Sequence, residues 1–252
     1  MKQITFDNIF TLGEVVTETE EYIHFHYPDM LTRYDSNFIK FKVEPSMNYF
    51  KEMEVYLRDY YLEKGQNHVK FTFPDNTNLA KDLTAYLKEN GYETGFLELY
   101  AINPKNYPSV SNNPDVEIQV VTDVNLELYL ELQYRQDVKY GVEFAEQKAE
   151  LIKRQLLDPN IRQLLAFYKE TPVGYVDIII SDGTVEIDNL AVEEQYRNKG
   201  IGSQLQKFAM DAYPEKTVVL VADGEDTPRD MYKKQNYQCL GFKYETLRIY
   251  KD

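Results

Sequence analysis

The second half of the chain shows a regular order of strand-like and helix-like apolar spacing. Apolar residues three or four apart predict helices, and short runs of alternating or continuous apolar residues predict strands. The predicted order is strand, helix, helix and three strands, over residues 116–121, 126–136, 143–157, 162–168, 173–180 and 185–192. We expect the last three strands to form an antiparallel meander, because tight turns separate them.

A polar segment over 193–202 precedes a further helix, whose apolar residues recur at helical spacing from Ile201 to Ala212. Pro214 should end that helix. The near-continuous apolar run over 218–222 is typical of an interior strand.

A helix start is marked by Thr227 as cap and Pro228 at the first helical position. This helix should run to about Gln235 and close at Asn236, which tolerates the left-handed conformation. Two strands are expected around Gly241 at the end of the chain.

The first half repeats part of this order. Strands are predicted over 37–43 and 69–73, helices over 47–64 and 79–89, and an extended segment over 92–102. Val69–Phe73 corresponds to Val218–Ala222, and Ala85–Tyr92 corresponds to Asp230–Tyr237. We interpret the first half as a diverged and truncated internal repeat of the second.

A proline- and asparagine-rich stretch over 103–115 lies between the halves and reads as a linker. The expected organisation is a first domain over 1–105, a linker over 106–115 and a second domain over 116–252.

Composition excludes several classes of protein. The 252 residues are 43% hydrophobic and 14% aromatic, which excludes global disorder. No apolar run approaches the ~18–20 residues that cross a bilayer, so no membrane interaction is expected. The first residues lack the pattern of a signal peptide, and a lone Cys239 cannot form an internal disulfide, so we expect a cytoplasmic protein.

The net charge of −14 argues against nucleic acid as a partner, because phosphates would be repelled. The charge is spread evenly, −6 over residues 1–112 (11 basic, 17 acidic) and −8 over residues 113–252 (17 basic, 25 acidic). A cationic small substrate is compatible with this balance, and solubility explains it equally well.

The segment most informative about chemistry leads from the strand over 185–192 into a loop with Gly200 and Gly202 at the start of a helix. Unpaired backbone N–H groups converge at such a helix start and bind anions. Arg197 and Lys199 would add positive charge beside them. A nucleotide-binding P-loop is disfavoured, because Gly202 is not followed by Lys and Ser or Thr. The pattern alone also fits an ordinary loop–helix junction.

In its ordered context, this segment resembles the GNAT superfamily of N-acetyltransferases. The family's acetyl-CoA loop, Q/R-x-x-G-x-G/A, is matched by Arg197-Asn-Lys-Gly200-Ile-Gly202, and the resemblance covers about residues 115–250. Tyr237 after Asn236 departs from the family's common Gly-Phe. The resemblance implies an α/β (α+β), tandem GNAT-like fold, in which helices flank a mixed central sheet and the N-terminal half is truncated and degenerate.

The resemblance also implies the cofactor site. Acetyl-CoA, as co-substrate, would bind through a strand edge and the pyrophosphate loop, formed by Leu190, Ala191, Val192, Arg197, Asn198, Lys199, Gly200, Ile201, Gly202 and Ser203. Pantetheine would lie where the strands over 185–192 and 218–222 splay apart. A backbone N–H near Leu190 would polarise the thioester carbonyl.

Two side chains are candidate catalysts. Tyr232 matches the family tyrosine that protonates the leaving thiolate, and because of this match we favour that role over the alternative of a core aromatic at a helix–strand contact. Glu186 matches a glutamate that some members use as base to deprotonate the amine, while many members use a water chain instead. Asp188 lies two residues after Glu186 on the strand, so both carboxylates should point to the same face of the sheet.

Other polar groups are weaker candidates. Asp223, Glu225, Asp226 and Asp230 could attract a cationic acceptor or could be solvated and capping charges. His24 and His26 alternate along a short strand with His68 elsewhere, but nothing in the spacing supports a metal, and none is expected. Cys239 is expected to be buried.

The leading hypothesis is an acetyl-CoA-dependent N-acetyltransferase, in which a primary amine of a small molecule or peptide attacks the thioester directly. One alternative is a non-catalytic acyl-CoA-binding sensor or scaffold, and another is a nucleotide-phosphate-binding protein. The oligomeric state is left open, a homodimer included. The first half lacks the loop glycines and has Leu87 where the repeat places Tyr232, so we expect it to wall the acceptor pocket.

Overall fold

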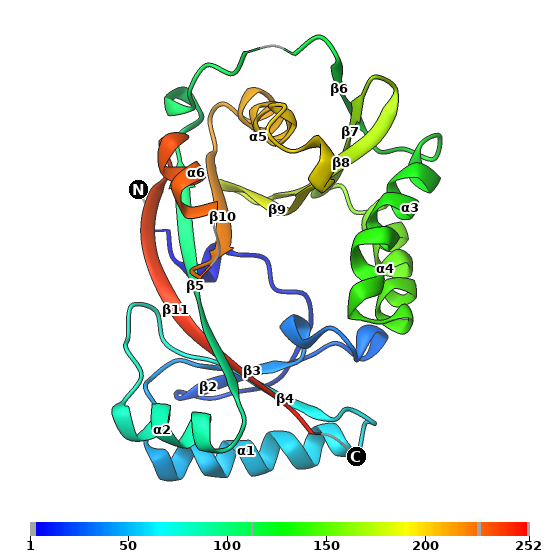
Figure 1. Cartoon of the computed structure of the whole chain (residues 1–252). Coiled ribbons are helices and arrows are strands. Elements are labelled where there is room, and N and C mark those ends of the chain that lie inside the picture. Colours follow the sequence, from blue (N-terminus) through cyan, green and yellow to red (C-terminus); the bar gives the residue numbers. More distant parts are fainter. Residues whose placement is uncertain (1–3, 112, 226–227, 251–252) are drawn as a thin grey trace.

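A computed structural model describes residues 4–111, 113–225 and 228–250, in which eleven strands form one continuous mixed sheet. The order across the sheet is β1-β2-β3-β4-β11-β5-β10-β9-β8-β7-β6 (Figure 1). The strands of the first half are β1 (Glu14–Glu18), β2 (Tyr22–His26), β3 (Phe38–Phe41), β4 (His68–Thr72) and β5 (Glu93–Ile102). Those of the second half are β6 (Val116–Val120), β7 (Ile161–Tyr168), β8 (Thr171–Ile180), β9 (Thr184–Val192), β10 (Thr217–Asp223) and β11 (Gln238–Ile249).

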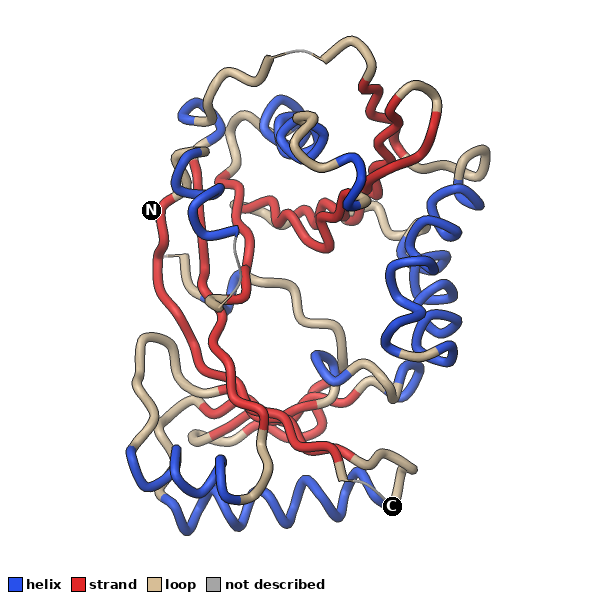
Figure 2. The backbone as a smooth tube through the Cα atoms, viewed as in Figure 1, coloured by secondary structure: helices blue, strands red, loops and turns tan. Residues whose placement is uncertain are grey.

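Six α-helices in the described residues flank the sheet: α1 (Met47–Leu62), α2 (Lys81–Glu89), α3 (Leu126–Asp137), α4 (Val142–Gln155), α5 (Ile201–Ala212) and α6 (Pro228–Lys234). Figure 2 shows α1 and α2 together on one side of the first-half strands. None of the helices described is both long and apolar enough to cross a membrane.

Local sequence explains the helix that dominates the first half. Ser46 caps α1 by accepting a hydrogen bond from the Tyr49 N–H at 3.3 Å. Phe50, Leu57 and Tyr61 recur at helical spacing and are fully buried against the sheet. The Ser46 cap therefore fixes where the helix begins, and the buried face anchors it on the sheet.

The predicted meander is confirmed, since β7, β8 and β9 pair antiparallel in sequence order. The repeat is confirmed in topology as well. Each half has a parallel pair of strands, β3 with β4 and β9 with β10. Outward from the central pair β11 and β5, the strands β4, β3, β2 and β1 on one side correspond to β10, β9, β8 and β7 on the other.

The expectation of two strands around Gly241 is wrong. β11 is a single long strand, and its register against β5 shifts only at a bulge between Cys239 and Gly241. A returning strand is unnecessary, because β5 of the first half occupies the place between β10 and β11. In exchange, β11 lies between β4 and β5.

The segment predicted as a linker has no regular structure beyond a short 3₁₀ turn at Pro104–Asn106. It nevertheless packs on the second half, because the Tyr107 hydroxyl donates to the Ser203 carbonyl at 3.2 Å. Gln235 also donates to that hydroxyl, at 3.1 Å.

The exchanged strands predict that neither half folds alone. Fragments 1–111 and 113–252, each missing both neighbours of its own final strand, should lack cooperative thermal unfolding when purified separately, because an unpaired central strand leaves backbone donors and acceptors unsatisfied. Mixing the fragments should restore the transition, measured by circular dichroism. A cooperative native-like transition in either isolated fragment would contradict this interpretation.

Candidate functional site

The loop before α5 presents backbone N–H groups to solvent space. Asn198 and Gly200 adopt left-handed conformations, with φ of 62° and 81°, which turn the chain sharply into the helix. Gly200 is the residue before the first helical turn, and no side chain of the described residues caps that turn. The N–H groups at the start of α5 and the positive end of the helix dipole therefore remain available to an anion.

The strands before and after this loop diverge, as expected for a site between them. β9 and β10 pair only from Thr184 and Thr217 to Glu186 and Val219. Beyond that point β9 keeps its pairing with β8 as far as Val192. The edge of β9 that faces away from β8 is thus open from Ile187 onward.

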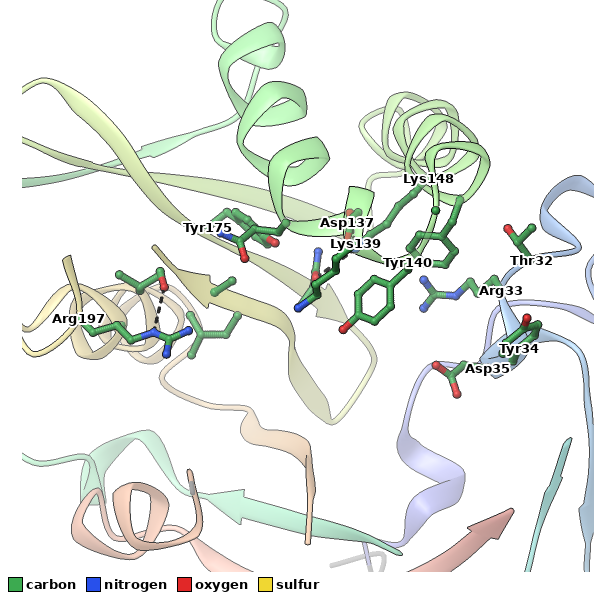
Figure 3. A pocket seen from close by; sticks show the side chains of 18 of the residues that line it. Thr32, Arg33, Tyr34, Asp35, Asp137, Lys139, Tyr140, Lys148, Tyr175 and Arg197 are labelled. Atoms are coloured by element: carbon green, nitrogen blue, oxygen red, sulfur yellow. Dashed lines mark hydrogen bonds and ion pairs between the residues drawn. The ribbon is translucent and has the colours of Figure 1, made fainter. Parts of the chain in front are cut away.

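A cavity of about 1500 Å³ extends from this loop to the first half of the chain. Nine of the ten residues predicted to bind acetyl-CoA line it, together with Tyr232: Leu190, Ala191, Val192, Arg197, Asn198, Gly200, Ile201, Gly202 and Ser203. The opposite wall comes from residues 32–35 and from β4 and β11. Figure 3 shows Arg197 on one side of this space and Arg33 to Asp35 on the other.

The two loop cations differ in position. The Arg197 guanidinium donates through Nε to the Val192 carbonyl at 3.3 Å and belongs to the cavity wall. Lys199 does not line the cavity; its ammonium lies over the Tyr168 ring, 5.2 Å from the centroid. Arg197 is therefore the loop cation that lines the cavity.

Tyr232 sits on α6 and is 8% exposed, so it is part of the core as well as of the cavity wall. Its ring lies 5.3 Å from that of Tyr100 on β5 and 5.6 Å from that of Tyr237, between centroids. Arg229 of the same helix forms a bidentate pair with the buried carboxylate of Glu98 on β5. The first half thus anchors the helix that carries Tyr232.

Glu186 lies on β9 but does not line the cavity. It is 7% exposed, and one carboxylate oxygen accepts a hydrogen bond from the Phe10 N–H at 2.7 Å. Burial raises the pKa of Glu186 to about 8, with a further increase from the neighbouring negative charge of Asp188. The structure therefore separates this candidate base from the other predicted site residues.

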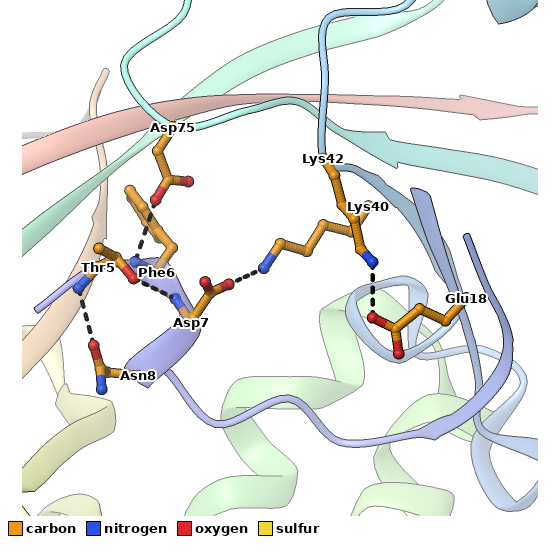
Figure 4. A network of polar contacts seen from close by, with 8 residues as sticks. All are labelled: Thr5, Phe6, Asp7, Asn8, Glu18, Lys40, Lys42 and Asp75. Atoms are coloured by element: carbon orange, nitrogen blue, oxygen red, sulfur yellow. Dashed lines mark hydrogen bonds and ion pairs between the residues drawn. The ribbon is translucent and has the colours of Figure 1, made fainter. Parts of the chain in front are cut away.

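The N-terminal segment that covers Glu186 is fastened to the first-half sheet (Figure 4). Thr5 and Asn8 form a reciprocal capping box around a 3₁₀ turn at Phe6–Asn8. Asp7 pairs with Lys40 of β3, and the Phe6 N–H donates to Asp75 at 3.4 Å. These contacts hold Phe10 over β9.

A buried polar network supports the β9 edge, and the sequence analysis did not identify it. Asn189 has a left-handed φ of 54° beside a bulge in the β8–β9 pairing. Its side-chain amide donates to Asp177 at 3.0 Å, and Asp177 also accepts from the Tyr129 hydroxyl. Burial raises the pKa of Asp177 to about 6. In the sequence, the pair Asp188-Asn189 before Leu190 was the only local indication of this network.

Gly174 on β8 was also missed. A Cβ at this position would lie 2.9 Å from the Ala191 carbonyl oxygen and 3.2 Å from a Val192 methyl. Only glycine lets β8 approach the cavity-lining end of β9 this closely.

The remaining candidates lie outside the cavity. Asp223, Glu225 and Asp230 are exposed near the end of β10 and the start of α6, while Asp226 and the predicted cap Thr227 lie outside the described residues. Cys239 is exposed, so the expectation that it is buried is wrong; it adjoins the β11 bulge, which interrupts the alternation of the strand.

The histidines belong to an aromatic cluster under α1. His24 is fully buried, its Nδ1 lies 3.1 Å from the Tyr56 hydroxyl, and its ring centroid lies 4.6 Å from that of Tyr60. His26 is hydrogen-bonded through Nδ1 to Asn37 at 2.8 Å. Burial lowers the pKa of His24 to about 4. No group of three metal-ligating side chains occurs within the described ranges.

Comparison with known proteins matches two family models. Residues 127–237 match the acetyltransferase (GNAT) family, and residues 4–100 match a domain of unknown function, DUF5613. No curated protein matches the chain.

Among solved structures, a functionally unknown conserved protein from Staphylococcus epidermidis ATCC 12228 shares 35% identity over 98% of both chains, with a TM-score of 0.92. A GCN5-related N-acetyltransferase from Kribbella flavida shares 13% identity over 93% of this chain and 89% of its own, with a TM-score of 0.60. A tandem GNAT protein from the clavulanic acid biosynthesis pathway shares 11% identity over 85% and 76%, with a TM-score of 0.54. The last two show likeness of fold.

The raised pKa of Glu186 predicts a pH-dependent loss of stability. Between its ordinary value of 4.5 and about 8, the native state holds a proton that the unfolded state has lost. The free energy of unfolding of the wild type should therefore fall relative to Glu186→Gln as pH rises from 5 to 8, by up to about 1.4 kcal/mol per pH unit. Urea unfolding at several pH values measures this difference.

The exposed Glu146 offers a matched control, and Glu146→Gln should follow the wild-type pH profile. Parallel profiles for the wild type and Glu186→Gln would show that the native carboxyl is not held protonated.

Proposed function

Because this chain belongs to the GNAT superfamily, with a diverged GNAT-like N-terminal half, we propose that it is an acetyl-CoA-dependent N-acetyltransferase. Its acceptor would be a primary amine of a small molecule or peptide, which attacks the thioester directly. The observation that carries the proposal is one cavity lined by the uncapped start of α5, the open edge of β9 and Tyr232.

The cavity wall fits the chemistry of acetyl-CoA. The free N–H groups at Gly200 to Ser203 and the Arg197 guanidinium would hold the pyrophosphate. Main-chain groups of Leu190 to Val192 would pair with pantetheine, since no strand in the described part of the chain pairs with this edge of β9. An N–H near Leu190 would polarise the thioester carbonyl.

Tyr232 would protonate the leaving thiolate, because its side chain reaches the cavity from the helix after β10. The role of Glu186 as base stays a prediction. For its carboxylate to act on an amine, the segment that carries Phe10 would have to move aside.

Substitution of Gly200 tests the cofactor site. Gly200→Val should weaken acetyl-CoA binding at least about tenfold, because the new side chain would shield the N–H groups that hold the pyrophosphate. Isothermal titration calorimetry with acetyl-CoA gives the affinity.

Gly65→Val is a matched control, since Gly65 has a similar φ of 77° and, like Gly200, open space around its Cβ position. It imposes the same backbone strain away from the cavity and should leave affinity unchanged. Failure of the wild type to bind acetyl-CoA would contradict both an enzyme and a CoA-binding module.

Removal of the Tyr232 hydroxyl tests catalysis. Tyr232→Phe should lower kcat by about 100-fold or more with little change in acetyl-CoA affinity, because general acid catalysis is lost while the ring remains. CoA release across a panel of primary amines measures the rate.

Tyr237→Phe is the control, because Tyr237 is buried beside Tyr232, donates to Gln206 at 2.8 Å and does not line the cavity. An unchanged rate in Tyr232→Phe would remove this residue as the acid. Binding of acetyl-CoA without turnover of any amine would favour a non-catalytic CoA-binding module.

A further inference from the structure

A segment of the first half, residues 27–36, crosses to the helices of the second half, and its residues 32–35 line the cavity wall opposite the loop before α5. We call this side of the cavity the acceptor end. The Thr32 hydroxyl donates to Gln147 of α4 at 2.8 Å. Asp29 pairs with Arg154 at the end of the same helix, at 3.1 Å. This bridging segment is therefore anchored on both halves of the molecule.

Asn37, fully buried beside β3, fixes the shape of the bridging segment. Its side-chain oxygen accepts from the Tyr27 N–H at 2.9 Å, and its amide donates to the carbonyls of Met30 and Arg33 at 3.2 and 2.8 Å. The backbone of Arg33 is thus held by a side chain that cannot move without disrupting the turn.

Arg33 extends from this fixed backbone into the cavity, toward Tyr140 on the opposite wall (Figure 3). Its Nε donates to the Ser36 hydroxyl at 3.1 Å, which orients the guanidinium. Within the described ranges, its two terminal nitrogens have neither a hydrogen bond nor an ion pair. These nitrogens are the pair that binds a carboxylate in bidentate fashion.

The other charges of the acceptor end are mostly satisfied inside the protein. Lys70 pairs with Asp35 and, at 2.9 Å, with Glu245. Lys148 pairs with Asp137 at 3.0 Å. These two lysines are therefore occupied and leave no net positive charge for a ligand.

Lys139 is the second cation on this side without a carboxylate partner among the described residues; its ammonium lies 4.8 Å from the centroid of the Tyr140 ring. Glu143 is the lining carboxylate that lacks a cation, and it is exposed and accepts from Gln147 at 3.1 Å. The four cations and four carboxylates that line this side balance in formal charge, and Arg33 and Lys139 are the two cations whose charged groups are not taken up by an ion pair among the described residues.

We propose that the acceptor is an amine that also carries a carboxylate, which Arg33 binds with support from Lys139. The class comprises amino acids and peptides with a free carboxyl group. This inference rests on the proposed function, because the amine must reach the β9 edge while the carboxylate lies at the bridging segment.

The test compares matched ligands that differ only in the carboxylate. Lysine with cadaverine, phenylalanine with 2-phenylethylamine, and an alanyl-lysine dipeptide with its C-terminal amide are titrated into the full-length protein with CoA present. Binding is measured by saturation-transfer NMR and calorimetry, and turnover with acetyl-CoA is measured separately. At least one carboxylate-bearing member should bind about 10- to 100-fold tighter than its partner, the range for a charged hydrogen-bonded pair.

Arg33→Ala should abolish this preference, and Arg33→Lys should restore only part of it, because an ammonium cannot form the bidentate pair. Arg162→Ala, at an exposed position on β7, should retain it. A preference that survives Arg33→Ala, equal binding within every pair, or no binding by any carboxylate-bearing member would overturn the proposal. Tighter binding of O-phosphoethanolamine than of any carboxylate would also overturn it, in favour of a phosphate-bearing acceptor.

The two proposals fail in different ways. Turnover of amines without preference for the carboxylate would overturn this inference and keep the acetyltransferase. Selective carboxylate binding that depends on Arg33, without turnover of any amine, would keep the site and remove the enzyme.

Discussion

The hydrogen bonding of β5 between β10 and β11 is the interaction on which the rest of the structure depends. It joins the first half to the second through backbone groups, with nine aligned positions against β11 and six against β10. A sheet interior excludes water, so these bonds persist only while both halves are folded. Each half completes the sheet of the other, and the cavity lies between walls that cannot part as independent domains would.

The two halves have similar topology but contribute different parts of the cavity and its supports. The second half provides the loop, the uncapped helix and the open strand edge. The first half provides contacts that position and enclose them: Glu98 holds α6, Phe10 covers Glu186, and Arg33 faces the cavity. The diverged first half has no glycine between its corresponding strand and helix, and its residues 32–35 form part of the cavity wall.

The sequence predicted what local pattern controls. Helix and strand positions, the antiparallel meander and the loop at Gly200 follow from spacing within a few residues. The two strands expected around Gly241 were wrong because the neighbour of β11 comes from residues 93–102, which no local pattern indicates. Arg33 was missed for the same reason, since its cavity is built by segments far apart in the chain. Cys239 was misjudged because a bulge changes which face a residue occupies.

The pairing of β11 with β4 also has a consequence for biosynthesis. His68 aligns with Ile249, so the first half acquires its last interior strand only after β11, about 180 residues further along the chain, has been translated. Contacts of such long sequence separation slow folding and leave apolar strand edges exposed while the chain emerges from the ribosome. We therefore expect this protein to depend on chaperones during synthesis more than a protein built from two self-contained domains.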